Sequence, residues 1–259
     1  MSGSSDTWAA GAAYEPFIGR WSRPVAAEFV AWLAVPSRHR WLDVGCGTGA
    51  LTETVLALTD PASVVAVDPS EGFVRHAAAH VTDPRVRFGV GSATDLPDGP
   101  FDAIVSGLVL NFVPDPAEAL AAMRAAAPGG VIAAYVWDYA EGMELLRVFW
   151  DAATELDRAA ADLDEGRRFP LCRRTALEDL WHGAGLADVE SRAIEVPTVF
   201  ADFDDYWTPF LGGQGPAPTY VANLDEDRRA ALRQALHHRI GDRVIRMRAR
   251  AWAVRGTAP

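Results

Sequence analysis

The chain has 259 residues, 49% of them hydrophobic, which is enough to bury one substantial core as a single large domain with insertions. Its 35 acidic and 24 basic residues give a net charge of −11, which disfavours nucleic acid and anionic membranes as partners. The sequence contains no lysine, so a catalytic lysine or Schiff base is excluded.

The cysteines and the N-terminal residues indicate the cellular compartment in which the protein is expected. Cys46 and Cys172 cannot be paired from the sequence, and a disulfide at Cys46 would obstruct the glycine-rich turn around it. The opening MSGSSDTW lacks a basic segment followed by an apolar run, and no later segment is long and apolar enough for a bilayer. We therefore expect an unprocessed, soluble, cytoplasmic protein without membrane insertion, and we expect no metal site.

The first part of the chain, residues 1–36, is expected to form an N-terminal flap and a helix. Residues 8–21 are rich in aromatic side chains and fit either a flap over a bound ligand or packing that holds the terminus in place. A helix is predicted over 23–35, because Ser22 can cap it, Pro24 suits its first turn and apolar residues recur at four-residue spacing.

The stretch from Trp41 to Ala50, WLDVGCGTGA, joins an apolar strand to a helix through a turn with three glycines. Because Gly45, Gly47 and Gly49 lack a Cβ atom, this turn can take positive φ angles and let a ligand approach the backbone. The first amides of the following helix point their N–H groups into the same space. The turn therefore predicts a nucleotide-like cofactor.

Two kinds of cofactor bind at such turns. Gly45, Gly47 and Ala50 satisfy the dinucleotide pattern G-x-G-x-x-[GA], but Asp43 would repel a pyrophosphate and attract the methionine ammonium of S-adenosylmethionine. The stretch resembles the first motif of the class I S-adenosylmethionine-dependent methyltransferases, and the chain is similar to their ubiquinone/menaquinone methyltransferase-like small-molecule branch. The resemblance rests on four motifs in the correct order and covers about the first 140 residues.

The second motif lies at the end of an apolar strand predicted over 63–67. Asp68 stands at the tip of this strand, where a doubly wound sheet places a carboxylate that can accept both ribose hydroxyls. The alternative is that Asp68 caps the helix that begins near Ser70, because the sequence DPSEGF suits a cap.

The third and fourth motifs follow strands predicted over 86–90 and 101–106. In the resembling family an acid usually contacts the adenine after the third strand, but here Ser92 stands at that position, which leaves Ala93 or Asp95 as substitutes. The resemblance places Ser106 and Gly107 at the sulfonium end of the cofactor. Asn111 stands where many relatives have a histidine, so a histidine base is not expected, and a polar residue that closes the strand end is the alternative.

The remaining chain keeps an α/β rhythm. Helices are predicted over 50–58, 115–127, 142–157, 175–184 and 228–239, with strands over 131–136, 188–196 and 244–254. Residues 200–220 predict a long ordered loop with aromatic anchors, which we interpret as a substrate lid. The expected fold is α/β: a doubly wound, seven-stranded, mostly parallel Rossmann-like sheet with an antiparallel last strand and a helical or loop cap.

Within a single methyltransferase domain, the cofactor core is expected over 37–138 and cap insertions over 139–174 and 197–224. The cofactor is expected to contact Arg20, Asp43, Gly45, Cys46, Gly47, Gly49, Asp68, Pro69, Ser92, Ala93, Ser106 and Gly107. The acceptor is expected to contact Tyr14, Asn111, Trp137, Tyr206 and Trp207.

The implied function is methyl transfer from S-adenosylmethionine to an oxygen, nitrogen or carbon atom of a small, partly apolar molecule. An NAD-type oxidoreductase and a non-catalytic S-adenosylmethionine-binding module are the alternatives. Asp138 and Tyr139, at the tip of the fifth strand, are the candidate proton acceptors, and an acid that caps the next helix is the alternative reading of Asp138. The sequence leaves the oligomeric state open.

Overall fold

The computed structural model describes residues 19–213 and 215–259, and these group into two compact units. The larger one, here called the sheet unit, contains residues 22–137, 171–194 and 251–259. The smaller one, the helical unit, contains residues 19–21, 138–170 and 195–250. Most of the expected flap over residues 8–21, including Tyr14, lies outside the described residues. None of the described helices is long and apolar enough to cross a bilayer.

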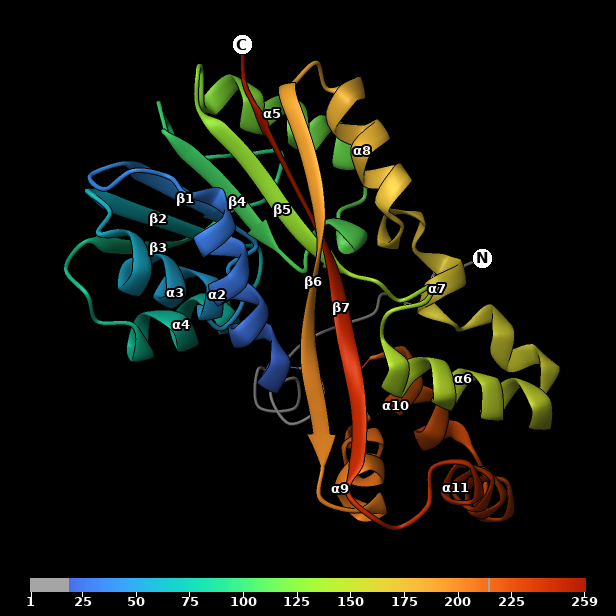
Figure 1. Cartoon of the computed structure of the whole chain (residues 1–259). Coiled ribbons are helices and arrows are strands. Elements are labelled where there is room, and N and C mark those ends of the chain that lie inside the picture. Colours follow the sequence, from blue (N-terminus) through green and yellow to red (C-terminus); the bar gives the residue numbers. More distant parts are fainter. Residues whose placement is uncertain (1–18, 214) are drawn as a thin grey trace. The chain divides into compact units, whose positions relative to one another are not determined.

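Seven strands form one sheet in the order β3-β2-β1-β4-β5-β7-β6 (Figure 1). Strands β1 to β5 are parallel, and β7 runs antiparallel to β5, with Val131 opposite Thr257. The expected doubly wound sheet with an antiparallel last strand is therefore confirmed. The strands are β1 (Arg40–Val44), β2 (Ser63–Asp68), β3 (Val86–Val90), β4 (Ala103–Gly107), β5 (Val131–Trp137), β6 (Ala187–Phe200) and β7 (Ile245–Thr257).

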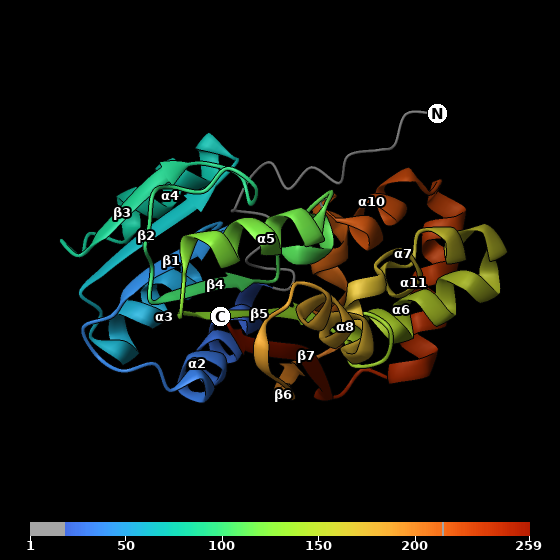
Figure 2. The ribbon, with the colours of Figure 1, turned by 90° about the horizontal axis from the view of Figure 1, so that it is seen from above.

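Helices cover both faces of the sheet, because the buried strand residues alternate between the two faces. Ile132 of β5 packs in a core with Leu120 of α5 and Trp181 of α8, whereas the ring of Tyr135 lies 4.7 Å from that of Phe29 in α2. Figure 2 shows α2 and α5 on opposite sides of β4 and β5. The helices of the sheet unit are α2 (Ser22–Leu33), α3 (Ala50–Thr59), α4 (Glu71–His80), α5 (Pro116–Ala126) and α8 (Arg174–Gly183).

The helical unit has its own core, which consists mainly of aromatic side chains. Phe149 and Phe210 stack with their ring centroids 4.6 Å apart, and Trp150 and Tyr206 pack around this pair. Aromatic rings bury large apolar areas, so they stabilise this unit strongly. Its helices are α6 (Glu144–Leu156), α7 (Glu165–Arg168), α9 (Phe203–Trp207), α10 (Pro216–Asn223) and α11 (Glu226–Ile240).

Residues 200–220 do not form the long loop that the sequence predicts. Strand β6 continues to Phe200, and α9, a 3-10 helix over Thr208–Gly212 and the start of α10 follow. The Asp202 side chain accepts a hydrogen bond from the amide of Asp205 and so caps α9. The prolines, which indicate a loop in the sequence, lie in the first turns of the next two helices, where proline is tolerated.

Candidate functional site

The glycine turn lies at the carboxyl end of β1 in the sheet unit. Gly45, Gly47 and Gly49 have φ angles of 78°, 53° and 93°, a region that favours glycine. A Cβ atom at Gly45 would lie 2.6 Å from the methyl groups of Val109, so this glycine is also required for packing. A Cβ atom at Gly47 would have no neighbour within 4 Å in the described part of the chain, so the backbone faces open space there.

Asp43 lies under this turn with its side chain almost fully buried, at 1% exposure. Its Oδ2 accepts a hydrogen bond of 2.6 Å from Thr52, whereas its Oδ1 has no partner among the described residues. Burial raises the pKa of Asp43 to about 7 against the lowering effect of the Thr52 hydrogen bond, and the charge of Asp68 raises it further. A buried carboxylate oxygen without a partner favours a cationic donor as its ligand.

Asp68, at the end of β2, connects the turn to the neighbouring strand. Its Oδ2 accepts a hydrogen bond from the amide of Gly47 at 3.0 Å, and its Oδ1 accepts one from the amide of Ser70 at 2.9 Å. Burial raises the pKa of Asp68, although both hydrogen bonds oppose the shift. Ser70, rather than Asp68, is the N-cap of α4. Because a carboxylate oxygen can accept more than one hydrogen bond, Asp68 still has capacity for hydroxyl groups of a ligand.

Cys46 follows Asp43 by three positions within the glycine turn, and Pro69 directly follows Asp68. The amides of Gly45 and Cys46 both donate to the carbonyl oxygen of Val67, which fixes the turn against β2. Burial, together with the charges of Asp43 and Asp68, raises the pKa of the free Cys46 thiol, so this thiol is a weak nucleophile.

Ser92 and Ala93 follow β3. The Ser92 hydroxyl accepts a hydrogen bond from the amide of Asp95 at 3.1 Å and so shapes the loop, while Ala93 packs against the core of the sheet unit. Asp95 lines a cleft of about 300 Å³ together with Val67. The groups that this loop could present to an adenine are therefore its backbone and the Asp95 carboxylate, because position 92 holds a serine and not an acid.

The end of β4 is held firmly in place. The Ser106 hydroxyl donates to the carbonyl oxygen of Val44 at 2.9 Å, and a Cβ atom at Gly107 would lie 2.6 Å from the hydroxyl oxygen of Tyr135. Asn111 lies in the 3-10 helix Leu110–Phe112, and its side-chain oxygen is buried without a partner among the described residues. Trp137, at the end of β5, likewise has a buried indole N–H without such a partner.

The two candidate proton acceptors belong to the helical unit. Asp138 is buried, its Oδ2 pairs with Arg250 through Nη2 at 2.6 Å and Nε at 2.7 Å, and its Oδ1 accepts a hydrogen bond from the amide of Glu141. This amide precedes α6, which begins at Glu144, so Asp138 closes a turn and does not cap the helix. Tyr139 is buried, with its ring 5.8 Å from that of Phe169.

The other predicted side chains of the helical unit are core residues. The Tyr206 hydroxyl donates to the carbonyl oxygen of Leu145 at 2.9 Å, and burial raises its pKa. Trp207 is buried beside Phe203 and Phe210. Arg20 is in the same unit, where it pairs with Asp205 and contacts two aromatic rings. The structure thus places Arg20, Tyr206 and Trp207 in one unit and the motif residues from Asp43 to Gly107 in the other.

The helical unit contains a buried polar cluster that the sequence analysis does not predict. The indole N–H of Trp150 donates to Glu165, and Arg147 pairs with the neighbouring Asp164. Burial raises the pKa of Glu165 to about 7, although the Trp150 hydrogen bond opposes the shift. The only signal in the sequence is the charged run DEGRR after an amphipathic helix, which is typical of an exposed turn.

Comparisons with known proteins match the part of the chain that contains these motifs. Residues 42–134, which contain the glycine turn, Asp68 and the end of β4, match the family described as a methyltransferase domain. The unpartnered Oδ1 of Asp43 and the open space at Gly47 fit the ammonium of S-adenosylmethionine better than they fit a pyrophosphate. This family match supports the resemblance to the class I S-adenosylmethionine-dependent methyltransferases.

Curated proteins similar to this chain match it over only part of their own length. A trans-aconitate 2-methyltransferase of Methylobacterium nodulans is 32% identical over 50% of this chain and 50% of its own. A ubiquinone biosynthesis O-methyltransferase of Xanthomonas axonopodis is 38% identical over 41% of this chain and 46% of its own. The chain therefore spans about half the length of the curated relatives it matches.

Solved structures extend the likeness of fold to most of the chain. A candidate type II methyltransferase of Anaeromyxobacter dehalogenans has a TM-score of 0.62 at 24% identity and covers 90% of this chain and 96% of its own. A phosphoethanolamine N-methyltransferase of Haemonchus contortus, solved with S-adenosylhomocysteine, has a TM-score of 0.58 at 17% identity, over 95% of this chain and 56% of its own. The family's cofactor is S-adenosylmethionine.

Proposed function

We propose that this chain transfers a methyl group from S-adenosylmethionine to an oxygen, nitrogen or carbon atom of a small molecule. The observation that carries the proposal is the Oδ1 of Asp43, a buried carboxylate oxygen under a glycine turn that has no partner within residues 19–213 and 215–259. A pyrophosphate would be repelled by this charge, whereas an ammonium group is attracted. The site thus favours S-adenosylmethionine over a dinucleotide.

Each motif residue has a proposed role toward the cofactor. Asp43 would hold the ammonium group, Asp68 the ribose hydroxyls, and the loop at Ser92 and Ala93 the adenine, while Ser106 and Gly107 would border the sulfonium. When bound, the cofactor supplies an activated methyl group, so the protein needs no metal or redox group for the transfer. The contribution of the chain is to orient the acceptor and to exclude water.

Positioning is the main catalytic effect that these residues support. Holding two reactants in line can contribute roughly 7–11 kcal/mol, because their translational and rotational freedom is lost on binding rather than in the reaction. Asp138 has both oxygens engaged by Arg250 and Glu141, and Asn111 is not a base. Tyr139 and Asp138 therefore remain candidates only for assisting a proton transfer, and this role stays a prediction.

The acceptor is proposed to be partly apolar. This part of the proposal rests on aromatic residues such as Trp137, whose buried indole N–H has no partner among the described residues. Tyr206 and Trp207, the other expected aromatic contacts, are buried in the core of the helical unit. Two of the relatives are named for trans-aconitate and for ubiquinone biosynthesis, both of them small-molecule chemistry. These names support a small-molecule acceptor and leave its identity to experiment.

The test is to incubate the protein with S-adenosylmethionine that is labelled in its methyl group and with a metabolite extract, and to follow the label. Transfer to a small molecule by the wild type, together with its loss in Asp43→Asn, supports the proposal. Binding of NADH in preference to S-adenosylmethionine would identify an oxidoreductase. Tight binding of S-adenosylmethionine without transfer to any fraction would identify a non-catalytic binding module.

A further inference from the structure

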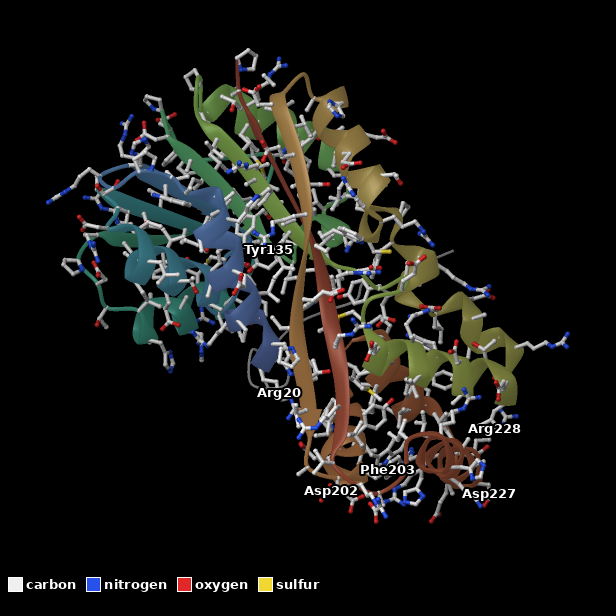
Figure 3. The ribbon with its side chains drawn as sticks, viewed as in Figure 1. Arg20, Tyr135, Asp202, Phe203, Asp227 and Arg228 are labelled. Atoms are coloured by element: carbon white, nitrogen blue, oxygen red, sulfur yellow. The ribbon has the colours of Figure 1, made fainter. Side chains whose placement is uncertain are left out.

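Strand β3 forms one edge of the seven-stranded sheet, because it pairs with β2 and no strand of the described chain pairs with its other side. In Figure 3 the labelled Tyr135 lies on β5, inside the sheet, whereas β3 lies beyond β2 at the outer edge. An edge strand presents unpaired N–H and C=O groups, to which a strand of another chain can bind. The outer side of β3 is therefore a candidate interaction surface.

The two edges of this sheet differ in how they are protected. Proteins shield edge strands from unwanted pairing with proline and with charged side chains. The opposite edge strand, β6, contains Pro197 and charged residues at several positions, whereas β3 reads VRFGV and contains no proline and one charged residue. The apolar Val90 of β3 is also 59% exposed. The edge at β3 is thus the one that can accept a further strand.

The backbone of β3 presents its free groups at alternate residues. The amide of Val64 in β2 donates to the carbonyl oxygen of Arg85, just before β3, at 2.9 Å, so Arg85 turns its carbonyl group toward β2. Successive residues of a strand turn their backbone groups to opposite sides, so every second residue after Arg85 also faces β2. The N–H and C=O groups of Phe88 and Val90 therefore point outward, away from the sheet.

An antiparallel pair of two β3 strands centred on Phe88 is self-complementary. Phe88 meets Phe88 of the second copy through its outward N–H and C=O groups, as in a hydrogen-bonded pair of an antiparallel ladder. Val86 then stands opposite Val90, so apolar residues meet on one face and cover the exposed Val90. On the other face Arg87 stands opposite Gly89, which has no side chain to obstruct it. A two-fold axis at Phe88 repeats each of these contacts.

The face that carries Arg87 and Gly89 also carries an acid. Gly89 lines a cleft of about 300 Å³ together with Val67 and Asp95. Arg87 and Asp95 are both exposed, and neither has an ion-pair partner within the described ranges 19–213 and 215–259. Arg87 of a second copy, opposite Gly89, would extend over this cleft toward Asp95. Each copy therefore offers a positive and a negative group that match those of the other.

We propose that β3 pairs antiparallel with β3 of a second copy of this chain, and that Arg87 of each copy contacts Asp95 of the other. The pairing involves residues of the sheet unit alone and does not depend on the proposed methyl transfer. It joins the two sheets into one across a two-fold axis. Because the interface is short and each copy carries a net charge of −11, the dimer should be weak and should depend on protein concentration.

The experiment measures the mass of the full chain by sedimentation equilibrium, over a series of concentrations up to about 1 mM. The mass of the wild type should rise toward twice that of the single chain. Arg87→Glu brings a glutamate against Asp95, and Asp95→Arg brings an arginine against Arg87. Each variant should therefore weaken the dimer by about tenfold or more, because the repulsive contact occurs twice.

An equal mixture of these two variants tests the contact between copies directly. In a mixed pair, the glutamate introduced at position 87 meets the arginine introduced at position 95, and the native Arg87 of one chain meets the native Asp95 of the other. The mixture should therefore dimerise within about threefold of the wild type, although neither variant does so alone. A folding defect in either variant cannot produce this recovery.

Two further substitutions provide controls. Arg158→Glu changes the net charge as Arg87→Glu does, at an exposed residue of the helical unit, and should dimerise as the wild type does. Val90→Pro removes an outward N–H and should weaken the dimer by about tenfold or more, whereas Val90→Thr keeps this N–H and should change it by less than about threefold. Should Val90→Pro fail to fold, the charge variants carry the test.

Three results would overturn the proposal. The first is a wild type that stays monomeric up to about 1 mM. The second is a dimer that Arg87→Glu and Asp95→Arg leave unchanged, which would place the interface on another surface. The third is a dimer that both single variants weaken but that their mixture does not restore, because Arg87 and Asp95 would then not contact each other between copies.

Discussion

The Thr52 hydroxyl donates to Asp43 Oδ2 at 2.6 Å and so fixes the carboxylate while Oδ1 has no partner among the described residues. This geometry makes the ionisation of Asp43 the step that prepares the glycine turn for a cation. Since burial raises the pKa of Asp43 to about 7, that ionisation takes place near neutral pH.

We therefore predict that the affinity for S-adenosylmethionine rises as the pH increases through about 7, because only the ionised Asp43 attracts the ammonium group. Asp43→Asn should bind about tenfold or more weakly just above pH 7, where the ammonium of the ligand is still largely protonated, and should lack this rise. Thr52→Val should shift the midpoint to higher pH, since the Thr52 hydrogen bond lowers the pKa. Calorimetry across the pH range checks this, and a flat wild-type profile would contradict it.

Asp68→Ala should lower the affinity for S-adenosylmethionine by about tenfold or more, through the loss of hydrogen bonds to the ribose. It should also destabilise the fold by about 1–3 kcal/mol, because the amides of Gly47 and Ser70 lose their acceptor. Asp68→Asn, which retains one acceptor oxygen, is the control and should be less destabilised. Unchanged cofactor affinity in a folded Asp68→Ala protein would remove Asp68 from the site.

The buried Glu165 should make the free energy of unfolding depend on pH. Its pKa is raised from 4.5 to about 7 in the folded state, so the folded chain binds more protons than the unfolded chain between these values. The free energy of unfolding should therefore fall as the pH rises from about 4.5 to 7, and Asp43 acts in the same direction.

Glu165→Gln should be more stable than wild type above pH 7, by a free energy on the order of 3 kcal/mol, while it keeps an acceptor for Trp150. Urea unfolding followed by tryptophan fluorescence at several pH values measures this. Glu141→Gln, at a largely exposed position, serves as the control and should leave the profile unchanged. If the free energy of unfolding of Glu165→Gln falls with pH as steeply as that of the wild type, Glu165 does not titrate between pH 4.5 and about 7.

Asp138→Asn should destabilise the protein by about 3 kcal/mol, because it leaves Arg250 without its buried partner. Arg250→Gln should cost a similar amount, and the double variant less than the sum of the two. With an identified acceptor, turnover by folded Asp138→Asn should fall by less than about a thousandfold. A complete loss of turnover with both ligands bound normally would show that Asp138 is an essential base.

The sheet unit could be predicted from the sequence because its signals are local. Apolar strands, the glycine turn and the acid at position 68 follow one another at short range, and the strand expected over 86–90 is observed with these bounds. The positions of the motifs could be predicted for the same reason, since each one ends a strand of the parallel sheet, whereas their contacts with the cofactor stay predictions.

The helical unit could not be predicted in the same way. Proline and glycine in 200–220 indicate a loop, yet the Asp202 cap and the proline positions start helices. The partners of Arg20, Asp138 and Glu165 are set by tertiary contacts, such as the pair of Asp138 and Arg250, which are 112 positions apart. No local sequence pattern predicts such contacts.

The two units alternate along the chain, and this limits the order in which they can fold and the ways in which the chain can be divided. The chain passes from one unit to the other after Trp21, Trp137, Pro170, Ile194 and Arg250, so neither unit is a continuous segment. The sheet unit receives its β7 strand only when residues 251–257 have been synthesised, and the helical unit requires the residues just before them. Both units can therefore complete their folding only after residues 245–257 have been synthesised, and no single cut in the chain can separate one unit from the other.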